Sequence, residues 1–295
     1  ERKYFLLERN NLDSIFNIVK ICMSRVVNDI DRYNGFLKHT SLMLSGTGCK
    51  YHNRLLPYIV KNHHNNEAHV KVFSHGGERV FFEDAWYWDW ELSYATEYVS
   101  YGEKSSVMLD KMIGNRVSFK SIGSSFHKEI YNRHYAEVVS DSKKVLYIPN
   151  SFVGESRQFP NAKLIDPVLY DWQVYLIKKM KFLGYTVIYK THPKGFFHDS
   201  NNIGLIADYE TSLSMDSILN EVNIVVSDSA GSAVIESICA GKHVTLIDMK
   251  QRPLNRLTLK DFEDLINIVS VDWVDNLPYI DDNLLLDALQ NTPSI

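Results

Sequence analysis

The sequence predicts an α/β protein whose second half is a doubly wound parallel sheet, and two observations support this. From residue 144 to residue 248, short apolar and β-branched segments alternate with amphipathic segments of helical period. Such alternation is typical of parallel strands that are joined by helices. The chain has 295 residues and is 45% hydrophobic, which is enough for two domains with separate cores.

The first half has a weaker α/β pattern. Residues 11–36 are predicted to be helical, because apolar side chains recur at helical spacing: Ile15, Ile18, Val19, Cys22, Met23, Val26 and Ile30. The segments "SLMLSGTG", "HVKVFSHGG" and "EYVSYGE" are predicted to contain short strands. A further helix is expected near residues 105–113.

The second half is clearer. Strands are predicted in "KKVLYIPNS", "YTVIYKTHP", "NIGLIAD", "NIVVS" and "HVTLID", and helices in "PVLYDWQVYLIKKMKFLG", "SMDSILNEV" and the segment after "NIVVS". A polar run at residues 140–143 precedes the first clear strand. We therefore predict domains of residues 1–141 and 142–279 and a helical tail of residues 280–295. Because the sequence begins at Glu1 without a methionine, we allow for missing residues in the first domain.

Composition and charge argue against several classes of function. The net charge of −4 gives no electrostatic reason to expect nucleic-acid binding. The sequence has no run of about 18 apolar residues, so no membrane span is expected, and no signal peptide is recognised. The three cysteines, Cys22, Cys49 and Cys239, match no metal spacing and favour a reducing compartment. We expect a cytoplasmic protein, for which peripheral association with the cytoplasmic face of the inner membrane stays open.

The segment "SDSAGSAVIESICAGKHVTLID" predicts a turn, a helix and a strand in succession. Ser227, Asp228 and Ser229 are residue types that cap helices, and Gly241 is suited to the position just after a helix. A helix that begins with such small residues leaves its first backbone N–H groups open to an anion, such as a phosphate. The simpler alternative is a helix cap without a ligand.

Three loops are predicted at the carboxyl ends of the strands, where doubly wound sheets bind ligands. They are "PNSFVGESR", "KTHPKG" and "SDSAGS". Together they offer cationic, imidazole and hydroxyl groups to one pocket: Arg157, Lys190, His192, Lys194 and the serines. Convergence on one pocket strengthens the phosphate hypothesis, although the lysines could instead be solvated and Pro193 could simply make a turn.

The same motifs resemble the C-terminal half of GT-B glycosyltransferases of bacterial surface polysaccharide synthesis. The matching features are the "KTHP" loop, the "SDS" turn, a helix with Glu236 and the "GKHV" strand, within residues 144–248. Retaining β-Kdo transferases, bacterial sialyltransferases and CDP-glycerol-dependent glycerophosphotransferases carry comparable elements. The resemblance implies a GT-B-like fold of two Rossmann-type, doubly wound domains with a cleft between them.

A second resemblance lies in "SHGGERVFFEDAWYWDWELSYATEYVSYGE". This segment is similar to a stretch of a transferase family of surface-carbohydrate biosynthesis. The matching residues are His75, Gly76, Gly77, Asp89, Glu91, Ser100 and Gly102, whereas Ser74 and Tyr101 replace Gln and Trp.

Roles follow from the chemistry and from these resemblances. The groups expected to bind the donor nucleotide are His192, Lys190, Ser227, Ser229, Ser232, Glu236 and Arg157. By the GT-B resemblance Glu236 binds the ribose hydroxyls, and the alternative is a surface charge. The expected catalytic residues are Asp89, Glu91 and His75, in an aromatic segment that could instead be interdomain core.

We therefore expect a metal-independent glycosyltransferase that moves a sugar, with Kdo from CMP-Kdo as best guess, to a glycan or glycolipid acceptor. No cofactor is expected besides the nucleotide-sugar donor. The alternatives are a CDP-glycerol-type or sialyltransferase-like enzyme, a nucleotide-sugar epimerase, and a non-catalytic carbohydrate-binding module. A Rossmann dehydrogenase is disfavoured, since no G-x-G-x-x-G follows the strands near Val145 or Val225.

Overall fold

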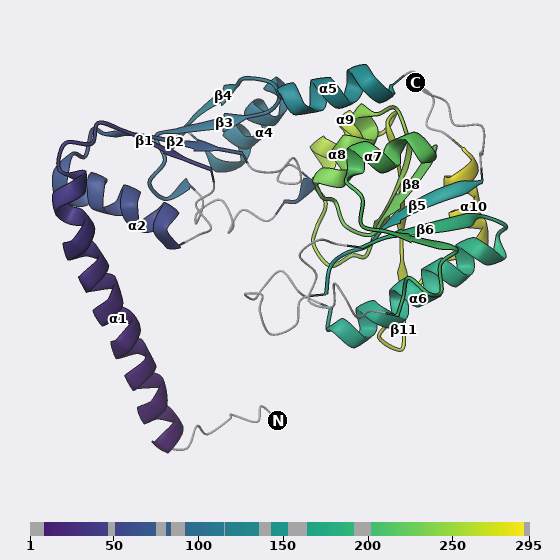
Figure 1. The fold of residues 1–295 in the computed structure, drawn as a ribbon, viewed down its shortest axis with the longest axis horizontal. Helices are drawn as coiled ribbons and strands as arrows, with labels where there is room; N and C mark the ends of the chain where they lie inside the picture. Colours follow the sequence, from purple (N-terminus) through teal and green to yellow (C-terminus); the bar gives the residue numbers. More distant parts are fainter. Residues whose placement is uncertain are drawn as a thin grey trace. The chain divides into compact units, whose positions relative to one another are not determined.

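The structure is a computed structural model of the 295-residue chain, shown in Figure 1. It describes residues 9–46, 51–74, 81–83, 92–114, 116–135, 143–152, 164–191 and 202–291. The chain divides into two compact units. The first unit holds residues 1–75 and 85–122, and the second holds residues 76–84 and 123–295.

The first unit contains a four-stranded parallel sheet in the order β1-β2-β3-β4. The strands predicted in "SLMLSGTG", "HVKVFSHGG" and "EYVSYGE" are confirmed as β1, β2 and β3. In the part of this unit that the structure describes, the strands follow chain order without reversal. The elements are α1 (Arg9–Leu37), β1 (Leu42–Ser45), α2 (Tyr51–Ile59), η1 (Val60–His64), β2 (His69–Phe73), β3 (Glu97–Ser100), α4 (Glu103–Ile113) and β4 (Ser118–Ser121).

Helix α1 confirms the helix predicted for residues 11–36. Its apolar side is only partly covered. From Val26 onward, including Ile30 and Tyr33, it packs against a small core formed by Leu37, Leu55, Ile59, Val60 and Ala68. Toward its beginning the side chains of Ile15, Ile18, Val19 and Met23 are exposed. The helical period was therefore predicted correctly, but only its C-terminal half contributes to the core.

The second unit contains a six-stranded parallel sheet in the order β10-β9-β8-β5-β6-β7. The chain enters at the centre with β5, runs outward to β7, and returns to the centre with β8. This reversal is the Rossmann-type order and creates a topological switch point between β5 and β8. The predicted doubly wound sheet is therefore confirmed. Its strands are β5 (Lys144–Ile148), β6 (Thr186–Lys190), β7 (Tyr209–Thr211), β8 (Ile224–Ser227), β9 (His243–Asp248) and β10 (Ile266–Ser270).

One predicted strand is wrong. The segment "NIGLIAD" forms turns, and β7 begins only at Tyr209. The backbone N–H groups of Leu205 and Ile206 bond to carbonyls three residues earlier, at Asn202 and Ile203. The apolar residues of this tight turn therefore have the sequence pattern of a strand although they do not form one. Ile203 is buried in the core without joining the sheet.

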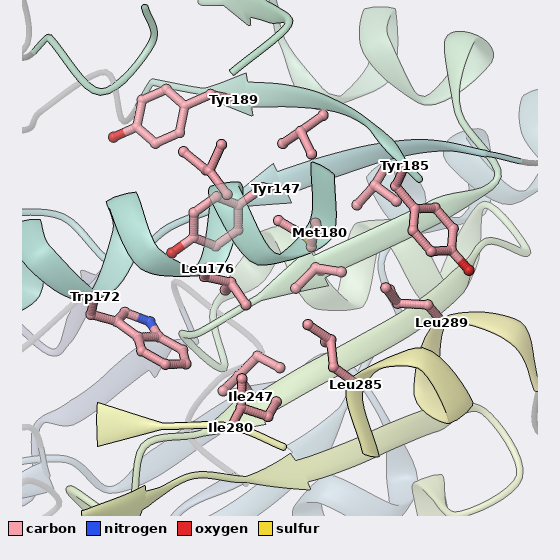
Figure 2. Packing of buried hydrophobic residues seen from close by; sticks show 14 of the residues in the cluster. Tyr147, Trp172, Leu176, Met180, Tyr185, Tyr189, Ile247, Ile280, Leu285 and Leu289 are labelled. Atoms are coloured by element: carbon pink, nitrogen blue, oxygen red, sulfur yellow. The ribbon is translucent and has the colours of Figure 1, made fainter. Parts of the chain in front are cut away.

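Helices cover both faces of the second sheet, and Figure 1 shows α6 on the face opposite α7, α8 and α9. The core on the α6 side takes alternate residues of the central strands, among them Val145 and Tyr147 of β5 and Val187 and Tyr189 of β6. Figure 2 shows Tyr147 and Tyr189 in this core. The remaining elements are α6 (Asp166–Phe182), α7 (Met215–Ile218), η4 (Leu219–Glu221), α8 (Ser232–Cys239), α9 (Arg256–Phe262), the hairpin of β11 (Asp272–Val274) and β12 (Leu277–Tyr279), and α10 (Asp282–Gln290).

Two helices extend the second unit beyond the residues predicted for the second domain. Helix α5 (Ser125–His134) lies before the predicted boundary at residues 141 and 142, yet it packs on this unit. The buried His134 places Nε2 2.9 Å from Oδ1 of Asp216 on α7. At the other end, α10 buries Leu285 and Leu289 in the main core, so this part of the predicted tail belongs to the unit.

Candidate functional site

The switch point of the second sheet lies where β5 and β8 end side by side, with Ile148 paired to Ser227. In doubly wound sheets ligands bind in the crevice at this place, beyond the carboxyl ends of the strands. Residues 149–152 follow β5, and residues 228–231 form the turn between β8 and α8. The predicted unit of strand, turn, helix and parallel strand is confirmed here, since β8 and β9 are parallel neighbours.

Ser227 ends β8 and is 1% exposed. Its Oγ lies 2.8 Å from the carbonyl oxygen of Ile148 and 2.9 Å from that of Ser229. The hydroxyl also accepts, at 3.3 Å, from the N–H of Ser229. Ser227 therefore ties β8 to β5 and shapes the turn, and a phosphate could use this hydroxyl only by displacing those bonds.

The start of α8 differs from the prediction. The helix begins at Ser232 with Gly231 as N-cap, which has no side chain to cap it, so the expected capping by Ser227, Asp228 or Ser229 is wrong. Those residues instead shape the turn and the core beneath it. The predicted end is confirmed, because Gly241 has φ of +67° just after α8.

The uncapped start of α8 leaves room for a ligand. A Cβ placed on Gly231 would meet no heavy atom within 4 Å among the described residues. Ser229 is half-buried beside this space and Ser232 is exposed. The first-turn amides carry the positive end of the helix dipole and have no capping side chain in this part of the structure. The arrangement suits an anion.

Asp228 is the first residue of this turn, and it is only 5% exposed. Its Oδ2 accepts hydrogen bonds from Oη of Tyr147 at 2.6 Å and from Nε1 of Trp172 at 3.0 Å. Its Oδ1 accepts a short hydrogen bond from the backbone N–H of Asn150. Burial raises the pKa of this carboxyl to about 6, although the same hydrogen bonds act to lower it.

The sequence held a signal for this position that the prediction of a cap overlooked. Side chains alternate along a strand, and Ile224 and Val226 of β8 both face the core that α6 covers. Extending that alternation by one step beyond the strand places Asp228 on the same buried side.

Behind Asp228 a second set of polar groups holds the loop after β5. Nε2 of the fully buried Gln173 donates to the carbonyl oxygen of Asn150 at 2.8 Å, and Oη of Tyr189 donates to Oε1 of Gln173 at 3.0 Å. Asn150 is thus held through its N–H by Asp228 and through its carbonyl by Gln173. In Figure 2 the hydroxyls of Tyr147 and Tyr189 point toward the end of the core where Trp172 lies.

Lys190 and Glu236 form a second polar group at this end of the sheet. Lys190 ends β6, is 9% exposed, and donates from Nζ to the carbonyl oxygen of Leu213 at 2.7 Å. Burial lowers the pKa of Lys190, and the nearby Glu236 opposes this shift. Burial likewise raises the pKa of Glu236, while Lys190 acts to lower it and Asp216 to raise it. Glu236 is therefore half-buried and interacts electrostatically with Lys190, and its predicted binding of the ribose hydroxyls stays a prediction.

Several predicted site residues lie outside the described residues: His75, Asp89, Glu91, Arg157 and His192. Their predicted roles stay predictions. Of the predicted donor-binding residues, the structure describes Lys190, Ser227, Ser229, Ser232 and Glu236, all in the second unit.

Two residues of the second resemblance have structural roles at the end of β3. Ser100 is 2% exposed, and its Oγ lies 3.0 Å from the carbonyl oxygen of Gly102 and 2.6 Å from Oγ of Ser106. Tyr101 donates from Oη to the carbonyl oxygen of Ser74 at 2.7 Å, which joins the ends of β3 and β2.

Among the residues described, no group of three or more His, Cys, Asp or Glu side chains is arranged to hold a metal ion. None of the helices in the described ranges has the length and apolar character needed to cross a membrane.

Comparison with known proteins gives a likeness in fold. No protein-family model matches the chain, and no curated protein matches it. Among solved structures, it resembles UDP-N-acetylglucosamine 2-epimerase from Rickettsia bellii, with a TM-score of 0.50 and 14% sequence identity. The match covers 91% of this chain and 69% of the epimerase chain. Together with the Rossmann-type order of the second sheet, this likeness shows that the chain has a GT-B-like α/β fold.

Proposed function

We propose that this chain is a nucleotide-sugar enzyme that binds the phosphate of its substrate at the start of α8. The observation that carries the proposal is the uncapped helix start at the switch point, with open space beside Gly231. The amides of the first turn and the hydroxyls of Ser229 and Ser232 supply donors to a phosphate there. These groups can also stabilise the negative charge of a departing nucleotide.

Lys190 and Glu236 complete the proposed site. A partly desolvated ammonium group adds positive charge near an anion, where it acts more strongly than in water. A carboxylate can accept two hydrogen bonds from neighbouring ribose hydroxyls. Because Lys190 and Glu236 interact with each other electrostatically, loss of either moves the pKa of the remaining one further in the direction set by burial. Arg157 and His192 are proposed to add donors from neighbouring loops.

The finer proposal is a glycosyltransferase that transfers a sugar, proposed to be Kdo from CMP-Kdo, to a glycan or glycolipid of the bacterial surface. It is supported by the resemblance of the "KTHP", "SDS" and "GKHV" motifs to transferases that use cytidine nucleotides. Asp89 or Glu91 would be the base or nucleophile, with His75 beside them. Helix amides would stabilise the leaving phosphate without a metal ion. We place the reaction in the cytoplasm, at the inner membrane where the acceptor is a glycolipid.

A second candidate is an epimerase that acts on a nucleotide sugar alone, and the fold likeness to a UDP-N-acetylglucosamine 2-epimerase favours it. The two reactions differ in their products. An epimerase returns a nucleotide sugar of unchanged mass without an acceptor. A transferase releases the nucleotide and needs an acceptor or water.

The test is a thermal-shift panel of CMP, CDP, UDP and GDP and their sugars, followed by mass analysis of incubated mixtures. A ligand present at about 100 times its Kd stabilises the folded state by about 2.7 kcal/mol. Ser229→Ala should weaken the binding of the best ligand by about 1–3 kcal/mol, as for a lost hydrogen bond to a charged group. Ser118→Ala, an exposed serine in the first unit, is the matched control.

No stabilisation by any ligand of the panel would refute the nucleotide-sugar proposal. Binding that Ser229→Ala leaves unchanged would refute the position of the phosphate. Binding without turnover would favour a carbohydrate-binding module, and turnover of CDP-glycerol would favour a glycerophosphotransferase.

A further inference from the structure

We propose that Asp228 is a positioning residue whose ionised carboxylate holds the loop after β5 against the turn after β8, and that its protonation loosens this loop and weakens ligand binding. The proposal rests on the proposed function for its ligand, whereas the positioning of the loop can be tested without one.

The geometry gives the carboxylate three donors from three parts of the unit. Tyr147 donates from β5, Trp172 from α6, and the backbone N–H of Asn150 from the loop after β5. Asp228 itself is the first residue of the turn that leads to α8. One side chain thus connects the two segments that border the switch point.

The three donors suit an ionised carboxylate better than a neutral group. An ionised carboxylate only accepts hydrogen bonds, whereas the protonated form carries a hydrogen that must itself be donated. That added hydrogen faces groups that are already donors. Either Tyr147 turns its hydroxyl to accept it, or the bond from Asn150 lengthens. Hydrogen bonds to a charged acceptor are also the stronger ones, so protonation weakens the hold on Asn150 in both cases.

The surroundings make this proton responsive near neutral pH. Among the described residues, the titratable group that faces Asp228 is the phenol of Tyr147, with Tyr189 of β6 next to it. Helix α6 contributes the uncharged Trp172 and Gln173. The dominant influence is therefore burial, which raises the pKa of Asp228 to about 6.

The first measurement needs no ligand. Hydrogen exchange at the backbone amide of Asn150 is compared at pH 7.5 in the wild-type chain and in Asp228→Asn, which keeps the shape and removes the charge. We expect Asn150 to exchange at least about tenfold faster in the variant, as for a lost hydrogen bond to a charged acceptor. Equal protection of Asn150 in the two proteins would overturn the proposal.

The second measurement is the affinity for UDP-N-acetylglucosamine and CMP-N-acetylneuraminic acid between pH 5 and pH 8. Each phosphate of the two probes has one strongly acidic oxygen that stays ionised throughout this range, so the phosphates do not titrate. The wild-type affinity should fall about tenfold as the pH drops through 6, and Asp228→Asn should bind weakly at every pH. A wild-type affinity that stays constant or rises toward low pH would overturn the proposal.

Two variants serve as controls. Asp208→Asn removes another carboxylate that accepts a backbone N–H, that of Val187 at 2.9 Å, near the amino end of β6, whereas Asp228 follows the carboxyl end of β8. It should leave both measurements unchanged. Trp172→Phe is the variant to use if Asp228→Asn fails to fold. It keeps the charge of Asp228 and the hydrogen bond from Asn150 to Asp228, so the affinity of this variant should still depend on pH. Loss of the pH dependence in Trp172→Phe would then count against Asp228. If neither probe binds the wild-type chain, the affinity is measured with the best ligand of the thermal-shift panel. If no ligand of the panel binds, the proposed function fails, and the exchange of Asn150 still decides the positioning role.

Discussion

The two sheets fasten the ends of their strands in different ways. In the first unit, the turn from β3 to α4 is held by neutral groups, namely the hydroxyls of Ser100 and Ser106 and the carbonyl of Gly102. In the second unit, the neutral hydroxyl of Ser227 also shapes the turn from β8 to α8, but the buried carboxylate of Asp228 is added to it and holds the neighbouring loop. Neutral hydrogen bonds are enough to order a turn, whereas a buried charge lowers stability at neutral pH. Under the proposed function, the buried charge of the second turn serves ligand binding at a cost in stability.

The largest expected effect concerns catalysis, and it compares the predicted catalytic residues of the first unit with the proposed phosphate site of the second. Asp89→Asn and Glu91→Gln keep side-chain shape but remove the charge that a base or nucleophile needs. At least one should lower kcat by about 100-fold or more, in the range typical of general-base loss, while the affinity for the nucleotide changes by only a few-fold. Steady-state kinetics with the substrate found in the ligand panel, together with calorimetry, would check this.

If both variants turn over like the wild type, Asp89 and Glu91 are excluded as base or nucleophile. If either loses nucleotide affinity as well, binding and catalysis are not divided between the units as proposed.

The next effect is the pH dependence of stability caused by Asp228. Its pKa is raised from 3.8 to about 6 in the folded chain, so the folded state holds this proton more tightly than the unfolded state does. The stabilisation is fully present below pH 4 and is lost as the pH rises through 6. Between these limits, the unfolding free energy of the wild type should fall by about 3 kcal/mol relative to Asp228→Asn.

Urea unfolding of both proteins at several pH values measures this difference. A constant difference between pH 4 and pH 8 would show that the carboxyl is not desolvated as the structure indicates.

The neutral turn provides the contrast. Ser100→Ala removes the hydroxyl that joins Ser106 and Gly102 in a buried position, so it should destabilise the chain by about 1–3 kcal/mol. Because no titrating group takes part in these bonds, the loss should be equal at pH 5 and pH 8. A loss that varies with pH would remove the contrast between the two turns.

The smallest effect is expected for the partner of Lys190. Glu236→Gln removes the charge that helps Lys190 keep its proton, so the pKa of Lys190 should fall further, in the direction set by burial. Affinity for a nucleotide sugar should drop modestly at pH 7.5 and more at pH 9. The drop grows with pH because Lys190 of the variant loses its proton at a lower pH than Lys190 of the wild type does. Calorimetry at the two pH values checks this. An affinity that rises in the variant would show that Glu236 repels the ligand.

The sequence predicted the architecture of the second unit well, because strands such as Ile224–Ser227 are continuous and apolar and Gly241 marks the end of the following helix. It failed at "NIGLIAD", where apolar residues in a turn resemble a strand. The capping residue was also missed, since Ser, Asp and Ser are all good caps, and only the alternation of side chains along β8 indicates that Asp228 turns inward. The hydrogen bond that Asp228 accepts from Trp172, 56 residues away in the chain, is a contact that local sequence patterns do not report.

The central claim is that a nucleotide phosphate binds the first amides of α8, and the most direct test is to follow those amides by NMR during a titration. The backbone N–H signals of Ser232 and Ala233 in the labelled chain would be recorded as the best ligand of the panel is added. The account predicts that these signals and that of Ser229 shift most, with saturation at the calorimetric Kd. Saturating binding that leaves them unmoved, with the large shifts confined to residues of the first unit, would contradict it.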